Sequence, residues 1–146
     1  MDTRSLELQH RVIIRRAIAL KGMSGMVRAP DDSREALGLI EAIDQLLVEH
    51  LTIEDQVLYP ALLDAPDAAT RAFAADCIEE MGGILDVWVH YREQWTAERI
   101  LADPRRFHEV TGGVVGALAS RVEKEDAELY PAMDALMAAR AGRDAA

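Results

Sequence analysis

A segment of eight residues occurs twice in the chain, and this repeat constrains the fold more than any other feature. Residues 54–61 read EDQVLYPA and residues 125–132 read EDAELYPA, a shift of 71 residues. The same shift, without a gap, brings further identical residues into register: Asp32 with Asp103, Arg34 with Arg105, Ile13 with Ile84 and Leu47 with Leu118. We interpret the halves, about 1–66 and 67–140, as duplicated helical hairpins. Each would expose an apolar face that the other half covers.

Apolar residues recur with helical spacing between the Gly and Pro breaks, which predicts an all-α fold. Strand signals are weak, because β-branched residues are sparse and aromatic residues make up only 5% of the chain. Four long helices are expected. The first runs from about Thr3 to Val27, and the second starts after Pro30 with Asp31, Asp32 or Ser33 as N-cap. The third follows the break at residues 64–67, and the fourth follows the N-cap Asp103, with Pro104 at the first helical position. Short connections favour an antiparallel up-down-up-down four-helix bundle over residues 1–140, with a frayed tail at 141–146.

Size and charge limit the classes of partner. The 146 residues, half of them hydrophobic, suit one core. A net charge of −10 argues against nucleic acid and anionic membranes, since both select basic faces. The single cysteine, Cys77, fits a reducing compartment, and neither a signal-peptide pattern nor an apolar run of roughly 18 residues is present. The sequence therefore predicts a cytoplasmic protein.

Polar side chains interrupt the predicted apolar stripes of three helices. The first stripe reads Leu6, His10, Ile13, Ala17 and Leu20; the second Ala36, Ile40, Ile43, Leu47, His50, Glu54, Val57 and Ala61; and that of the last helix Phe107, Thr111, Val114, Leu118, Arg121 and Glu125. Because these stripes face one interior, we expect the polar groups to converge there.

This convergence points to a cation. A buried carboxylate costs several kcal/mol unless a cation or hydrogen-bond donors compensate it. His50 and Glu54 are four residues apart, so their side chains leave one helix face together. Imidazole and carboxylate ligands suit iron, manganese or zinc. The alternative is a hydrogen-bonded core pair with no ligand role.

The residues resemble those of the hemerythrin-like, or HHE cation-binding, family. The resemblance rests on His10, on His50-x-x-x-Glu54 followed by Leu58-Tyr59-Pro60, and on Glu125 followed by Leu129-Tyr130-Pro131, and it covers nearly the whole chain. It implies a four-helix bundle with a non-haem di-iron site held by histidines and two bridging carboxylates. Members of the family carry or sense oxygen, or handle nitric oxide, redox stress and iron.

Two departures from that pattern predict a reduced site. The shift of 71 residues pairs His10 with Met81 and His50 with Arg121, so both histidines of the second half are missing. One interpretation is a single metal ion, with Arg121 as a fixed cation in the second position. Its ligands would be His10, His50, Glu54 and Glu125. The other is a metal-free scaffold with a buried Arg–Glu network; Met81 is a core residue or, less favoured, a thioether ligand.

The remaining candidates receive less weight. His90 falls opposite the apolar face of the third helix, and His108 lies beside the inward stripe of the fourth. Trp88, Tyr91 and Trp95 are expected in the core, with a dimer interface as the alternative. Tyr59 and Tyr130 lie either at the end of the core or near the site.

No nucleophile with its base and no nucleotide loop is present. A binding or sensing role is therefore favoured over catalysis. Non-haem iron is the expected cofactor, with zinc or manganese as alternatives. Oxygen or nitric oxide is the expected small ligand, and a protein partner or a homodimer is the remaining possibility.

Overall fold

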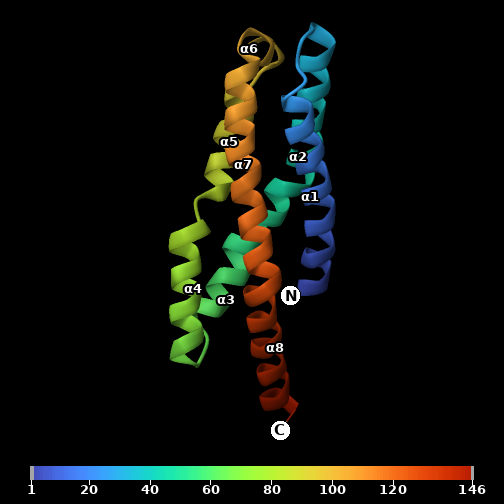
Figure 1. The fold of residues 1–146 in the computed structure, drawn as a ribbon. Coiled ribbons are helices and arrows are strands. Elements are labelled where there is room, and N and C mark those ends of the chain that lie inside the picture. The colour runs from blue at the N-terminus through green and yellow to red at the C-terminus, as the bar shows by residue number, and fades with distance from the viewer. Residues whose placement is uncertain (1, 146) are drawn as a thin grey trace.

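The computed structural model describes residues 2–145, and all regular structure within them is helical. The helices, in chain order, are α1 (Thr3–Ser24), α2 (Pro30–Ile53), the π-helical turn η1 (Glu54–Leu58), α3 (Tyr59–Leu63), α4 (Ala68–Met81), α5 (Ile84–Gln94), α6 (Ala97–Ala102), α7 (Pro104–Lys124), the π-helical turn η2 (Glu125–Leu129) and α8 (Tyr130–Ala145) (Figure 1). Among the described residues, no helix is long and apolar enough to cross a membrane.

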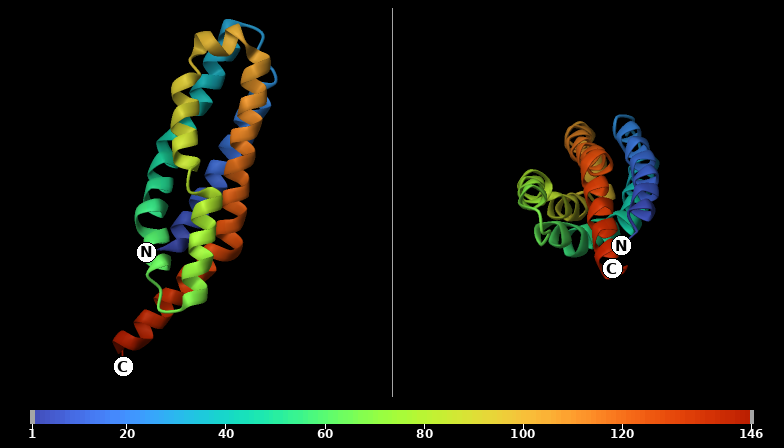
Figure 2. Two further views of the ribbon diagram at one scale, coloured as in Figure 1. Left: turned by 90° about the vertical axis from the view of Figure 1, so that its left-hand side faces the viewer. Right: turned by 90° about the horizontal axis from the view of Figure 1, so that it is seen from below.

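The long helices run lengthwise and pack in pairs (Figures 1 and 2). Both α2 and α7 contact α1 on one side and α5 on the other. At the lower end of Figure 1, α3 packs against α4 and α8, and the last turns of α8 project beyond the other helices. The four contacting helices α1, α2, α5 and α7 therefore enclose one interior.

Two apolar clusters fill the interior at different levels along the helices. The upper core includes Ile13, Ile40, Leu47, Trp88, Phe107 and Leu118. The lower core includes Leu6, Leu58, Leu62, Cys77, Leu129 and Met133. On α1, His10 lies between Leu6 of the lower core and Ile13 of the upper core. His10 therefore lies at the boundary between the two apolar clusters.

The start of α2 differs from the prediction. Ala29 is the N-cap, and Pro30 occupies the first helical position, where its missing N–H costs nothing. Asp32 lies one turn inside and accepts hydrogen bonds from the backbone N–H groups of Arg28 and Ala29, both at 2.9 Å. The proposed N-caps Asp31, Asp32 and Ser33 were wrong because the proline fixes the helix start earlier.

The other helix ends are close to the expectation. The N-cap of α7 is confirmed, since the Asp103 side chain accepts from Arg106 N with Pro104 at the first position. The first helix ends at Ser24, three residues before the predicted Val27. At the other end, α8 continues past Ala141, where a frayed tail was expected. The domain boundary at residue 140 stays a prediction.

The third predicted helix is broken into α4 and α5. The break lies at Gly82-Gly83, where Gly82 N donates to Ile78 O at 2.7 Å and ends α4. A Cβ atom at Gly82 would lie 2.6 Å from the Ile78 carbonyl oxygen, so this close approach needs glycine. The break leaves the Met81 carbonyl free to bond elsewhere.

Each copy of the sequence repeat contains a π-helical turn. In η1, Tyr59 N donates to Glu54 O, and in η2, Tyr130 N donates to Glu125 O, each bond spanning five residues. Pro60 follows Tyr59 and Pro131 follows Tyr130, and the chain stays helical through both prolines. The wider turn shifts the inward face by one residue.

This shift corrects the predicted stripe of the second helix. Val57 was expected to point inward, but 47% of it is exposed, whereas Leu58 is completely buried. Ala61 is only partly buried, and Leu62 fills the core instead. The prediction assumed an unbroken α-helical period, which the π turn interrupts.

Candidate metal centre

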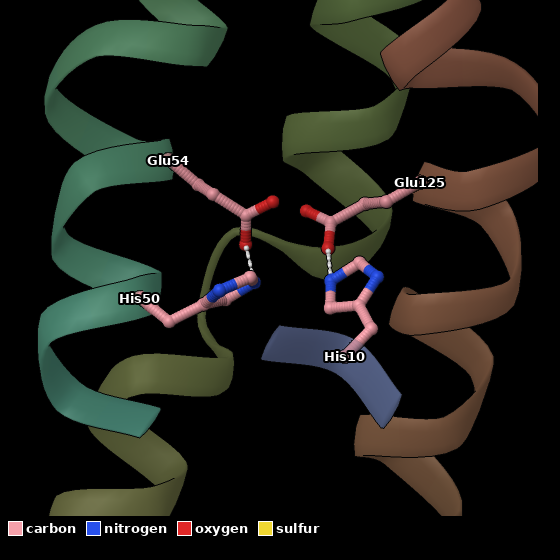
Figure 3. A group of neighbouring side chains, drawn as sticks. All are labelled: His10, His50, Glu54 and Glu125. Carbon is pink, nitrogen blue, oxygen red and sulfur yellow. Dashed lines mark hydrogen bonds and ion pairs between the residues drawn. The ribbon is translucent and has the colours of Figure 1, made fainter. Parts of the chain in front are cut away.

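Four buried side chains from four helical segments meet between the two cores. His10 comes from α1, His50 from α2, Glu54 from the start of η1 and Glu125 from the start of η2 (Figure 3). One potential ligand atom from each lies within 4.8 Å of those of the others, and all four side chains are buried. The four residues selected from the sequence as metal ligands are therefore brought together.

His50 and Glu54 face each other with unsatisfied atoms. His50 Nδ1 lies 2.7 Å from Gln9 Oε1, which accepts its proton. Burial, together with nearby His10, lowers the pKa of His50 to about 4, so the ring is neutral at pH 7. Its Nε2 therefore presents a lone pair to Glu54 Oε1 at 3.0 Å, and neither atom has a hydrogen-bond partner. Two buried acceptors this close require a cation or a proton between them.

His10 is oriented by a carboxylate at the edge of the cluster. Its Nδ1 lies 2.7 Å from Asp126 Oδ1, and its Nε2 lies 3.1 Å from Glu125 Oε1. Burial acts to lower the pKa of His10, but the hydrogen bonds to Glu125 and Asp126 outweigh it and raise the pKa overall. A carboxylate on the far nitrogen fixes the ring orientation and makes the inward nitrogen a better ligand.

Two tyrosines donate to the two carboxylates across the halves. Tyr59 Oη donates to Glu125 Oε2 at 3.3 Å, and Tyr130 Oη donates to Glu54 Oε2 at 2.7 Å. Burial raises the pKa of both carboxyl groups, and Arg121 and hydrogen bonds offset part of that rise. The sequence left the tyrosines between the end of the core and the site, and the structure places both hydroxyl groups at the site.

Arg121 lies beside the four-residue cluster and bonds to both halves. Its side chain is 1% exposed, and Nε donates to Glu125 Oε2 at 3.1 Å. Nη2 donates to Asp55 Oδ1 at 3.1 Å and lies 3.5 Å from Glu54 Oε1. The guanidinium also covers the ring of Tyr59, with 5.3 Å from Cζ to the centroid. One fixed positive charge therefore serves three carboxylates.

Met81 contributes through its backbone. Arg121 Nη1 donates to the Met81 carbonyl at 3.2 Å, the group that the break at Gly82-Gly83 leaves free. The Met81 side chain belongs to the lower apolar core. This favours the interpretation of Met81 as a core residue, and no sequence pattern indicates the role of its carbonyl.

The other candidates lie away from the cluster. His90 is exposed on α5, and His108 Nδ1 is 2.7 Å from Ser24 Oγ near the end of α1. The aromatic side chains of Trp88, Tyr91 and Trp95 are buried in the upper core, which confirms the packing interpretation for them.

A family model supplies the wider context for this geometry. The model of the hemerythrin HHE cation binding domain matches residues 1–140. The chain belongs to this family. No curated protein and no solved structure matches the chain. The recognition made from His10, His50, Glu54 and Glu125 is confirmed, and the hemerythrin HHE family name suggests that the cluster binds a cation.

The donor set fits such a cation. Two imidazole nitrogens and two carboxylates converge, and neither atom of the facing pair, His50 Nε2 and Glu54 Oε1, has a hydrogen-bond partner. Nitrogen and oxygen ligands of this kind suit a first-row transition metal.

Proposed function

We propose that this hemerythrin-family chain binds one transition-metal ion through His10, His50, Glu54 and Glu125. The observation that carries the proposal is the pair of facing acceptors, His50 Nε2 and Glu54 Oε1, at 3.0 Å inside the protein. A cation between them removes the repulsion and compensates the buried carboxylate. Asp126 and Gln9 hold the two rings so that one nitrogen of each faces the cluster.

The fold in this proposal is an antiparallel up-down-up-down bundle of two pseudo-symmetric hairpins. The contacts of α1 and α5 with both α2 and α7 support it, as do the π turns at the same position in each repeat. In such a bundle, the two carboxylates that begin η1 and η2 face each other across the internal axis. That axis is where a shared ion is best held.

Iron is the proposed metal, with manganese or zinc as alternatives. Redox change and affinity for oxygen or nitric oxide are what iron would supply when bound. The chain's own residues hold the two rings, neutralise the second carboxylate and exclude water. Because Arg121 already bonds to Glu125, Asp55 and the Met81 carbonyl, a second divalent ion would meet a fixed positive charge. The site therefore takes one ion.

A sensing or metal-buffering role suits this centre better than turnover. The four ligands are buried, and the void beside them is about 10 Å³, room for no more than about one water molecule. An organic substrate does not fit in this void. We place this role in the cytoplasm, because the single Cys77 is a buried free thiol that fits a reducing compartment.

A metal-free scaffold is the second candidate function. It is favoured by the same Arg121 contacts, since a guanidinium that bonds to Glu125 and lies 3.5 Å from Glu54 already compensates part of the buried charge. In that case the protein would act through a protein partner or as a homodimer.

Elemental analysis of protein purified without a histidine tag separates the two functions. We expect about one metal ion per chain, lost in His50→Ala and kept in the control His90→Ala, because His90 is exposed on α5. Two ions per chain would contradict the role of Arg121. The absence of metal after growth with added iron would favour the scaffold.

A further inference from the structure

We propose that Tyr130 is a fifth ligand of this centre and binds iron(III) through its phenolate oxygen. This inference rests on the proposed metal binding and names a ligand that lies outside the His/Glu cluster. The chemistry is that of a hard, anionic oxygen donor selecting a trivalent ion.

The Tyr130 hydroxyl lies among the other donor atoms. Its Oη is 2.9 Å from His10 Nε2 and 2.7 Å from Glu54 Oε2. Other pairs of neighbouring candidate ligand atoms lie at similar distances. His10 Nε2 is 3.1 Å from Glu125 Oε1, and His50 Nε2 is 3.0 Å from Glu54 Oε1. Adjacent ligands around an octahedral ion with bonds near 2.1 Å lie about 3 Å apart. The distances from Tyr130 Oη to its neighbours therefore fit a ligand position as well as the distances from the histidine nitrogens do.

The side chain is held in this position from two directions. Its ring stacks on His10, with centroids 5.1 Å apart and planes inclined by 17°. Its backbone N–H closes the π turn on the Glu125 carbonyl. In a regular α-helix, residues five apart differ by about 140° in direction, so the wider turn brings Tyr130 and Glu125 to the same side. The ring is buried and has little freedom to leave the cluster.

The phenolate favours iron(III). With His10 and His50 neutral, the carboxylates of Glu54 and Glu125 supply two negative charges, and Arg121 lies 3.1 Å from Glu125 and 3.5 Å from Glu54. A Tyr130 phenolate adds one negative charge, which a trivalent ion compensates better than a divalent ion does. On metal uptake the O–H bond of Tyr130 breaks, the O–Fe bond forms and the proton leaves to the buffer.

Tyr59 occupies the equivalent position of the other repeat and provides a matched control. Its Oη bonds to Glu125 Oε2 at 3.3 Å, and its ring is covered by the Arg121 guanidinium. Tyr59 therefore faces the fixed positive charge, whereas Tyr130 faces His10. The two tyrosines therefore differ in the side chain that packs on their rings, Arg121 on Tyr59 and His10 on Tyr130.

The test uses the full chain, loaded with ferric nitrilotriacetate and freed of excess iron. An iron(III)–phenolate pair absorbs visible light by charge transfer, and histidine and carboxylate ligands alone give no comparable band. We expect the wild type to show this band and resonance-enhanced phenolate vibrations. Tyr130→Phe should retain most of the iron, but its visible absorbance per bound iron should fall at least tenfold. Tyr59→Phe should keep the visible absorbance per bound iron, and Tyr91→Phe, whose hydroxyl bonds to Thr111 in the upper core, should keep both the iron and the absorbance.

Each outcome decides something different. Iron bound without a charge-transfer band, or a band that survives in Tyr130→Phe, would overturn the tyrosine ligand and leave metal binding intact. No iron in the wild type would overturn the proposed function, and the tyrosine ligand with it. Should Tyr130→Phe lose its iron, the Raman spectrum of the wild type decides, because phenolate vibrations support the ligand and their absence refutes it.

Discussion

The two halves of the chain carry the same carboxylates but different partners for them. In residues 1–66, His10 and His50 supply two imidazoles near Glu54. In residues 67–140, Met81 and Arg121 occupy the positions of those histidines beside Glu125. The aspartates that follow the glutamates diverge accordingly, because Asp126 orients His10 whereas Asp55 accepts from Arg121. One half therefore has an arginine where the other has a histidine, and that guanidinium lies within 3.5 Å of both buried glutamates.

The largest expected effect comes from restoring the first-half residues in the second half. We expect the double variant Arg121→His/Met81→His to bind two metal ions per chain, because it removes the fixed charge and supplies two imidazoles at the positions that the repeat pairs with His10 and His50. Inductively coupled plasma analysis counts the ions, and a change in visible absorption supports the result. Arg121→His alone should gain part of the second ion.

Failure of the double variant to take up more metal, while its helical circular dichroism stays at the wild-type level, would show that the two halves are not equivalent in geometry. The shift of 71 residues would then describe a sequence repeat whose paired residues do not occupy equivalent positions at the metal centre.

Removing the arginine should destabilise the metal-free protein. Arg121→Ala leaves Glu54, Glu125 and Asp55 without their shared cation, and breaking a buried ion pair costs about 3–5 kcal/mol. Urea unfolding in the presence of a chelator measures this loss, with Arg15→Ala on the exposed face of α1 as the control. A change below about 1 kcal/mol, the usual value for exposed pairs, would show that water already compensates the acids.

The smallest effect separates the two equivalent aspartates. Asp126→Asn should weaken metal binding by about 10–100-fold, because His10 loses the carboxylate that orients it. Asp55→Asn should leave metal affinity within a few-fold, since its partner is Arg121. Competition with a chromogenic chelator gives both dissociation constants. Equal losses in the two variants would contradict the assignment of His10 and Arg121 to different roles.

The helical fold and the four converging residues could be predicted because the α-helical period holds over α1, most of α2 and α7. The stripes from Leu6 to Leu20 and from Phe107 to Glu125 are buried as expected. The spacing of His50 and Glu54 places both on one helix face with no further information. Family membership followed from the same residues and their repetition.

Val57 and the tyrosines show where the sequence was insufficient. An α-helical period places Val57 inside, and the π turn exposes it instead. The sequence left Tyr59 and Tyr130 between the end of the core and the site, and the structure places both hydroxyl groups at the site. The proline after each turn signals an irregularity, but a proline also fits a kink or a helix end. Which one forms depends on the packing of Leu58 and Leu129 in the lower core, and this involves residues far apart in the chain.

The repeat of residues 54–61 at residues 125–132 predicted two similar helical halves and a common site for Glu54 and Glu125. Helical periodicity is a local property, so the sequence alone carried it. Only the tertiary structure decided that Arg121 bonds to Glu125 and to the Met81 carbonyl and lies 3.5 Å from Glu54 Oε1, and that Tyr130 lies beside His10. Those contacts join segments 40 residues or more apart, except the one between Arg121 and Glu125. Their formation depends on how whole helices pack, which no local pattern records.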